Sequence, residues 1–307
     1  MSNADTIPAT HFRVERLSGN PIIHPDLEGF EGKVGENING PSLIRVPDWL
    51  ENPLGRYYLY FAHHCDDHIR MAFSDQLEGP WRVHTPGILH LDDAPGRGHI
   101  ASPDIHIEEE HQRIRMYFHQ PPVKESEHGL QVSYVAFTND GLSFKPEDEI
   151  LGTSYFRVFQ YEGAWYAFAM NSVDGGIFYR SENGITGFSA GPEMIPRIRH
   201  NGLFVEGKTL FLFFSRAQDT PERILLTTID LTEDWHGWRA SEIEEVLESE
   251  EDWEGGDLPL ERSEYGTVRV PARQLRDPGI FQEDGQTYLL YSVAGEQGIG
   301  IAKLHRV

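Results

Sequence analysis

The stretch LRDPGIFQEDGQTYLLYSV, from Leu275 to Val293, decides the predicted fold. Two short runs rich in Ile, Phe, Leu and Tyr flank the dipeptide Asp284-Gly285. Such runs indicate β-strands, and an Asp-Gly pair between them favours a tight hairpin because Gly readily adopts the positive φ that the turn requires. The stretch therefore predicts two antiparallel strands, the first of which is opened by the polar pair Arg276-Asp277.

The same phrase recurs along the chain of 307 residues. Each copy has an apolar strand opened by small or polar residues, an aromatic-rich strand, and a third strand that often ends in a Gly-containing turn. The copies begin at Asn39, Ala101, Ser154, Arg199 and Leu275. Five copies of one short-stranded unit are typical of a β-propeller, in which stacked neighbours bury the faces that a single blade leaves open.

The N-terminal region supplies a strand that the last copy lacks. The fifth copy ends with the chain before a fourth, outer strand. The phrase FRVERLSGNPIIHP, from Phe12, resembles the outer strand of the first copy, WRVHTPGILHL, from Trp81. Both run from an Arg-Val pair through Gly to an apolar pair and a His. We therefore expect the N-terminal strand to complete the last blade, which removes exposed sheet edges.

These patterns predict an all-β fold, a single domain formed by one five-bladed β-propeller. The predicted blades cover residues 38–97, 98–152, 153–197, 198–250, and 270–307 together with 11–25. An open β-sandwich with irregular strands is the alternative. The segment Glu242–Glu264 departs most from the repeat and is strongly acidic. We expect it to be a solvated insertion near the funnel mouth, with a short helix over Ser241–Glu251.

The charge and the cysteine content of the chain exclude several classes of binding partner and site. With 26 basic and 49 acidic residues the formal charge is −23, which argues against a nucleic-acid or anionic membrane surface as partner. Cys65 is the single cysteine, so an intrachain disulfide and a cysteine-based metal cluster are excluded. The opening residues MSNADTIPAT have no basic start and no apolar run, so we expect a cytoplasmic protein.

Polar residues stand where each innermost strand of the propeller begins. Because these strands line the central channel and start near one mouth, we expect their first residues to converge. They are Asn37, Asn39, Ser102, Asp104, Tyr155, Arg157, Arg199, His200, Asn201, Arg276 and Asp277. The ends of the second strands add His63, His64, His119, Asn171, Arg216 and Glu296. Burying such groups unpaired is costly, so they predict a binding pocket, with a channel filled by water as the alternative.

The chain resembles the five-bladed propeller glycosidases of glycoside hydrolase family 43, which includes arabinanases and β-xylosidases. The resemblance is carried by the Asp277-Pro278 pair that opens a strand, the Asp284-Gly285 turn and the Tyr-rich strand after it. Fainter echoes are Asn39-Gly40-Pro41 and Ser102-Pro103-Asp104. The resemblance covers nearly the whole chain and implies a propeller fold, a carbohydrate substrate and three acidic groups in the funnel.

The implied acids are a base opening the first blade, a tuning Asp opening the second, and a Glu acid further round. This sequence departs from that pattern, because its first blade opens with Asn39 and its third carries Arg157. Glycoside hydrolysis needs one carboxyl to protonate the leaving oxygen and another to activate water or attack directly. The catalytic candidates are Asp277 as base and either Asp104 or Glu296 as acid. Alternatively, the two aspartates bond nearby backbone and Glu296 is an exposed hairpin acid.

The remaining candidates are predicted to bind substrate. They are Asn39, His64, His119, Arg157, His200 and Arg276. The guanidinium groups of Arg157, Arg199 and Arg276 near one mouth suit a uronate or sulfated glycan, unless each pairs with a neighbouring acid. We predict no cofactor and no metal site, because no tight ligand spacing is present. A channel ion such as calcium, held by histidines of different blades, is the alternative.

The leading function is therefore a glycoside hydrolase with carboxylate acid/base catalysis. A first alternative is a polysaccharide lyase, in which a His or Tyr abstracts a proton beside a uronate that Arg neutralises. His119, His200 and Tyr155 matter most in that case. A second alternative is a propeller that binds carbohydrate without catalysis.

Overall fold

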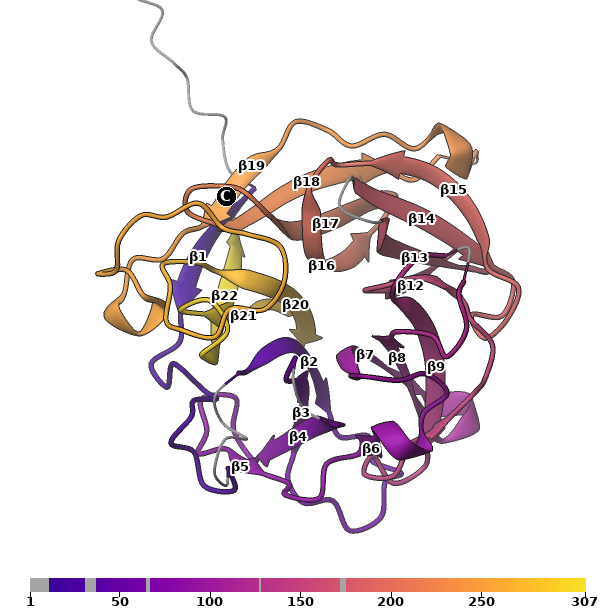
Figure 1. Ribbon diagram of the computed structural model, residues 1–307, viewed down its shortest axis with the longest axis horizontal. Coiled ribbons are helices and arrows are strands. Elements are labelled where there is room, and N and C mark those ends of the chain that lie inside the picture. Colours follow the sequence, from indigo (N-terminus) through magenta and orange to yellow (C-terminus); the bar gives the residue numbers. More distant parts are fainter. Residues whose placement is uncertain (1–10, 31–36, 65–66, 127, 172–174, 233) are drawn as a thin grey trace, which may run out of the picture.

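The computed structural model describes residues 11–30, 37–64, 67–126, 128–171, 175–232 and 234–307. Five antiparallel sheets stand around a common axis, as Figure 1 shows. This arrangement confirms the predicted five-bladed propeller and excludes the open sandwich. In the described part of the chain, no helix is long and apolar enough to cross a membrane.

Each blade is a sheet, and in blades one to four the successive strands follow one another outward from the axis in chain order. Blade one has β2 (Asn39–Arg45), β3 (Tyr57–Ala62), β4 (His68–Ser74) and β5 (Arg82–Val83), with β6 (Leu89–His90) also on β4. Blade two has β7 (Ala101–Glu108), β8 (Arg113–Gln120), β9 (Val132–Thr138) and β10 (Lys145–Pro146), with β11 (Gly152–Thr153) also on β9. Blade three has β12 (Arg157–Tyr161), β13 (Ala164–Asn171), β14 (Gly175–Ser181) and β15 (Ser189–Met194).

Blades four and five follow the same plan. Blade four has β16 (Ile198–Glu206), β17 (Thr209–Arg216), β18 (Ile224–Asp230) and β19 (Glu244–Leu247). Blade five has β20 (Arg276–Glu283), β21 (Gln286–Val293), β22 (Gly298–Arg306) and, outermost, β1 (Phe12–Arg16). In the described segments the helical elements are single 3-10 turns, η2 (Leu91–Asp93), η3 (Glu109–His111), η4 (Trp235–Gly237) and η5 (Asp252–Glu254).

Strand β1 closes the ring as predicted. It pairs antiparallel with β22, with Phe12 opposite Arg306, and the two strands lie side by side in Figure 1. The ring of Phe12 also packs against three aromatic rings of blade four, with centroids 5.7–6.3 Å apart: Phe204, Phe211 and Phe213. The N-terminal strand therefore completes blade five and fastens it to blade four.

The hydrophobic core lies between neighbouring blades. One cluster joins the buried side chains of Ile44 and Met71 in blade one to Met116 and Phe118 in blade two. Similar clusters join blades three and four, and blades four and five. The second strands β3, β8 and β17 are buried along almost their whole length, which explains their largely continuous apolar sequences.

The start of the innermost strand is distorted in the same way in several blades. The pairing of β7 with β8 slips between Ala101 and Asp104, and that of β20 with β21 slips between Arg276 and Gly279. An extra residue at such a bulge bends the strand and redirects its side chain. One residue in each of the bulges of β2, β7 and β20 has positive φ: Gly40 (63°), Ser102 (54°) and Asp277 (50°). Tyr155, two residues before β12, also has positive φ (64°). Positive φ costs energy for a residue other than Gly, so Ser102, Tyr155 and Asp277 are strained.

The helix expected over Ser241–Glu251 is wrong, because this segment contains β19. Leu247 is buried in the apolar cluster between blades four and five, and Glu244 pairs with His11 at 2.6 Å. The requirement for an outer strand thus overrides the high acid content. The solvated insertion is also wrong in part, since Ser249, Glu254 and Ser263 are fully buried.

Phe12→Ala tests the closure. Removing the ring should lower the free energy of unfolding by about 3–5 kcal/mol, because it leaves a cavity at the joint between blades four and five. Urea denaturation followed by tryptophan fluorescence measures the change. Arg13→Ala, on the exposed face of the same strand, serves as control and should change stability by less than about 0.5 kcal/mol. Equal effects of the two substitutions would contradict a closing role for Phe12.

Candidate functional site

A pocket of about 520 Å³ opens at the mouth where the inner strands begin, and it is called the funnel pocket here. Blades one to four and the segment before β20 contribute its walls, mainly through His64, Gln131, Tyr155, Met170, Asn171, Arg199 and Tyr265. Among the described residues that line it, none is a carboxylate. The acids of the predicted site must therefore act from behind this wall or elsewhere.

Glu296 lies directly behind the wall and is fully buried. Its Oε1 accepts a hydrogen bond from Arg276 at 3.0 Å. Its Oε2 faces donors on four residues: Asn37 Nδ2 (2.6 Å), His64 Nδ1 (3.0 Å), Thr267 Oγ1 (3.1 Å) and the Val268 amide (3.2 Å). The alternative of an exposed hairpin acid is thus wrong.

The surroundings of Glu296 fix its charge. Burial alone would raise the pKa of this carboxyl, but His64, Arg276 and Asn37 outweigh it and hold the pKa well below its usual range. The carboxylate therefore stays ionised. A proton donor needs the opposite environment, so Glu296 is an anchor for its neighbours in this structure.

His64 is held by that anchor and lines the funnel pocket. The ring nitrogen Nδ1 faces Glu296 at 3.0 Å and the amide of Asn39 at 2.9 Å. The carboxylate of Glu296 can only accept, so this contact requires the proton on His64 Nδ1. The Asn39 amide donates to Asn37 Oδ1 at 2.7 Å, and it is then a donor beside a donor at His64. The other nitrogen, Nε2, lies on the side of the ring away from Glu296 and can exchange a proton with a ligand.

Two arginines near the mouth are paired with buried acids. Arg276 is fully buried between Glu296 and Glu222, whose Oε2 lies 3.3 Å from its Nε. Arg199 Nε lies 3.0 Å from Glu222 Oε1, and its NH1 donates to the Gly266 carbonyl at 3.0 Å. Both guanidinium groups are therefore already neutralised by buried carboxylates of the protein. These contacts do not support the expectation that Arg199 and Arg276 bind an anionic sugar.

Glu222 was missed by the sequence interpretation, although a signal for it exists. It stands two residues before β18, as Glu296 stands two residues before β22. Both are therefore in the same place of the repeat, in the turn between the second and third strands. An acid at this place in two blades is the pattern that would have indicated a shared cation.

Asp277 lies under the pocket wall and is fully buried. Its Oδ2 accepts hydrogen bonds from Ser292 Oγ at 2.9 Å and the Gly40 amide at 3.3 Å. Its Oδ1 is in close contact with Nδ1 of His200. The ring of His200 packs against Tyr155, which lines the pocket, with centroids 4.1 Å apart. Asp277 thus meets the pocket through His200 and Tyr155.

The ring of His119 also packs against Tyr155, with centroids 4.1 Å apart. Burial, with smaller effects from nearby cationic groups, holds the pKa of both His119 and His200 well below its ordinary value. Both imidazoles are therefore neutral at pH 7. Burial also raises the pKa of Tyr155 to about 12, so its hydroxyl stays protonated.

Asp104 and Arg157 lie elsewhere in the channel. They line a second space of about 180 Å³ that is bordered by all five inner strands and shares no residue with the funnel pocket. Asp104 Oδ2 accepts hydrogen bonds from His106 Nε2 at 2.9 Å and the Val158 amide at 2.8 Å. Burial would raise the pKa of Asp104, but His106 and Arg157 outweigh it and the pKa falls below its usual range. Arg157 donates to the Asn201 and Pro103 carbonyls, both at 3.0 Å.

The structure thus brings six of the nine candidates together at the wall of the funnel pocket or directly behind it: Asn39, His64, His200, Arg276, Asp277 and Glu296. His119 packs next to them. Asp104 and Arg157 each follow a positive-φ residue, Ser102 or Tyr155, by two positions, and they line the deeper space of the channel.

Comparison with known proteins places the chain in a family. It is 34% identical to uncharacterized protein R118 of Acanthamoeba polyphaga mimivirus over 326 residues, which cover 95% of this chain and 90% of the relative. The chain belongs to the family of protein R118. No protein-family model matches it. Because R118 is itself uncharacterized, membership of the R118 family assigns no activity.

Solved structures show how widely the fold of the R118 family is shared. A GH43_1 enzyme from Xanthomonas citri complexed with xylose matches with a TM-score of 0.57 at 14% identity, over 88% of this chain and 86% of that one. An α-L-arabinanase from Cellvibrio cellulosa complexed with arabinohexaose gives 0.58 at 12%, over 88% and 92%. A glycosyl hydrolase from Bacteroides ovatus gives 0.67 at 12%, over 96% and 94%. The resemblance to propeller glycoside hydrolases is therefore confirmed for the fold.

Arg276→Met tests the buried ion network. Removing the guanidinium leaves Glu222 and Glu296 buried without their shared cation, which should lower the free energy of unfolding by about 3–5 kcal/mol. Chemical denaturation measures the loss. The control is Arg223→Met, whose partners Glu245 and Glu248 are partly exposed, and it should cost less than about 1 kcal/mol. A near-neutral Arg276→Met would mean that the network does not support the fold.

His119 gives a prediction for the pH dependence of stability. In the unfolded chain its ring titrates near 6.5, whereas the folded ring binds a proton only at much lower pH. The unfolded state therefore binds more protons as the pH falls, and stability should decrease from about pH 7 to about pH 5.5. His119→Gln should flatten part of this slope in urea denaturation curves taken across the range. His111→Gln, at an exposed position, should leave it unchanged. An unaltered slope in His119→Gln would contradict the buried neutral ring.

Proposed function

We propose that this protein is a glycoside hydrolase that binds a carbohydrate in the funnel pocket and cleaves a glycosidic bond there. The observation that carries the proposal is the pair His64–Glu296, in which a buried carboxylate holds a pocket-lining imidazole by one nitrogen at 3.0 Å. The shared fold supports it, since matching propellers are described as complexed with xylose and arabinohexaose.

The wall of the pocket favours a neutral sugar. Arg199 and Arg276 are committed to Glu222 and Glu296, so neither offers a free fork to a uronate or sulfate. Met170 and Tyr265 supply apolar surface, while Gln131 and Asn171 supply amide groups that can bind hydroxyls. This combination suits an uncharged pyranose or furanose, which presents apolar faces and a rim of hydroxyls.

Hydrolysis needs a group that protonates the leaving oxygen and another that takes a proton from water. We assign the first role to His64 in its imidazolium form, in which Nδ1–H is paired with the Glu296 carboxylate and Nε2–H is given to the leaving oxygen. We assign the second to His200, a buried neutral ring that packs directly behind the pocket-lining Tyr155 and whose Nδ1 contacts Asp277. As His200 accepts the proton of the attacking water, the Asp277 carboxylate stabilises the imidazolium that forms. The two acids Glu296 and Asp277 thus act as positioning residues.

Elimination is the weaker alternative. A lyase requires a cation that neutralises the uronate carboxylate, and the arginines at this mouth are engaged by Glu222 and Glu296. A non-catalytic sugar-binding propeller is the stronger alternative, because no carboxylate lines the funnel pocket in the described part of the chain.

Asp277→Asn and His64→Gln test the assigned roles. The wild type should release new reducing ends from neutral xylo- or arabino-oligosaccharides. Each substitution should lower kcat by about 10²–10⁴-fold, the size of a lost proton transfer. An amide at position 277 presents a donor to His200, which removes the acceptor that orients this ring. Because the amide keeps the shape of the side chain, the melting temperature should change little.

His305→Gln is the matched control, since this histidine pairs with Glu15 at an exposed position on β22. It should retain wild-type turnover. Full activity in both site variants would remove their roles from the mechanism. Ligand-dependent rises in melting temperature without any product would identify a binding propeller, and a product that absorbs near-ultraviolet light would identify a lyase.

A further inference from the structure

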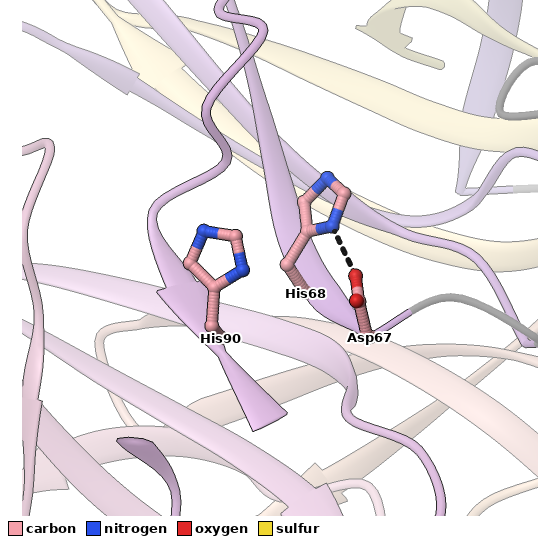
Figure 2. Close-up of side chains that lie close together, drawn as sticks. All are labelled: Asp67, His68 and His90. Carbon is pink, nitrogen blue, oxygen red and sulfur yellow. Dashed lines mark hydrogen bonds and ion pairs between the residues drawn. The ribbon is translucent and has the colours of Figure 1, made fainter. Parts of the chain in front are cut away.

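Blade one carries a second group of ionisable side chains, outside the funnel pocket. Asp67, His68 and His90 lie together at the start of β4 and on β6, as Figure 2 shows. One donor atom from each lies within 4.8 Å of the other two. His68 and His90 are directly opposite in the β4–β6 pairing, and their ring centroids are 5.2 Å apart with a tilt of 33°. These three residues are called the blade-one cluster.

The ring nitrogens of the blade-one cluster are oriented by their neighbours. His90 Nε2 lies 2.6 Å from the carbonyl of Pro86, so it carries the proton and leaves a lone pair on Nδ1. His68 Nδ1 lies 2.8 Å from Asp67 Oδ1, the separation of a hydrogen bond, so an ion shared by these two atoms would replace the proton between them. Metal-binding histidines usually donate their second ring N–H to a carbonyl or carboxylate, because this fixes the tautomer and the ring orientation. His90 already has that arrangement.

The turn before β6 is shaped around the His68 ring. Gly87 has a φ of 71°, and a Cβ atom at this position would lie 2.3 Å from His68 Cδ2. Only a residue without a side chain lets the turn that carries Pro86 close over His68. The close approach of Gly87 to His68 keeps the Pro86 carbonyl where it accepts from His90 Nε2. The backbone of this turn therefore determines how the two imidazole rings are oriented.

We propose that the blade-one cluster binds a zinc ion through His68, His90 and Asp67, with water as the fourth ligand. Two imidazoles and one carboxylate are ligands that zinc accepts in a tetrahedral site with one open position. Calcium and magnesium prefer sites made entirely of oxygen ligands, so they fit this cluster poorly. The Asp67 side chain is 76% exposed and that of His68 is 13% exposed, which leaves a route for the ion from solvent.

The ion would have a structural consequence for blade one. Strand β6 has two residues and pairs with the first two residues of β4. A metal bridge between His68 and His90 would fasten this short strand to β4. His64, which lines the funnel pocket, precedes β4 by four residues in the sequence. Zinc would therefore anchor the start of β4 close in sequence to a pocket residue.

Titration of tag-free protein with zinc chloride alone tests the site, by calorimetry and by competition with a chromophoric chelator. The wild type should bind one equivalent of zinc and should melt at a higher temperature in its presence. Cobalt(II) should give the intense visible absorption of a four-coordinate ion. His90→Asn should weaken zinc binding at least tenfold and abolish the melting shift. The side chain of His90 is exposed, so this variant should fold like the wild type.

His111→Asn is the matched control, because it removes an exposed histidine from η3 in blade two. It should bind zinc as the wild type does. Asp67→Asn and His68→Asn should each weaken zinc binding. If either variant fails to fold, the zinc affinity of His90→Asn alone tests the site. The proposal is overturned if the wild type binds less than one equivalent. It is equally overturned if His90→Asn binds as tightly as the wild type, or if magnesium displaces zinc at equal concentration.

Discussion

The architecture of the mouth depends on one guanidinium placed between two carboxylates. Arg276 is fully buried and contacts both Glu296 and Glu222. Charges removed from water are tolerated only where each has partners, so the three side chains fix one another's positions. Glu296 then orients His64, and Glu222 holds Arg199 at the wall of the funnel pocket. A single buried cation thus links blades one, four and five at the place where a ligand would bind.

The strained inner strands give the mouth its chemistry. An ordinary strand would point alternate side chains into the packed spaces between blades. The bulge at the start of β20 instead turns Asp277 toward His200, and Tyr155 in blade three, likewise at positive φ, packs on the same ring. Backbone strain of this kind persists only where surrounding contacts over-determine it. The Ser292 hydroxyl and the Gly40 amide supply such contacts to Asp277.

Much of the fold could be predicted from the sequence, because the hairpin Asp284-Gly285 and its counterparts repeat and Phe12 opens a matching outer strand. The acidic helix could not be excluded, since the pairing of β19 with β18 is a tertiary requirement that local composition does not show. Convergence at the mouth was predictable for Asp277 and Glu296. Their partners were not, because burial and pairing depend on side chains such as Glu222 that come from other blades. The depth of Asp104 in the channel could not be predicted either. It follows Ser102 by only two residues, yet its side chain lines the deeper space and not the mouth.

The pairing of β1 with β22 has a consequence for biosynthesis. Phe12 pairs with Arg306, a residue that is synthesised much later, so the β1–β22 ladder cannot form before then. During translation the first four blades can assemble while the fifth is still inside the ribosome, with β1 and the outer face of blade four unprotected. Unpaired strand edges of this sort invite association between nascent chains. Strand β1 therefore has to remain without its sheet partner during synthesis until β22 has emerged from the ribosome.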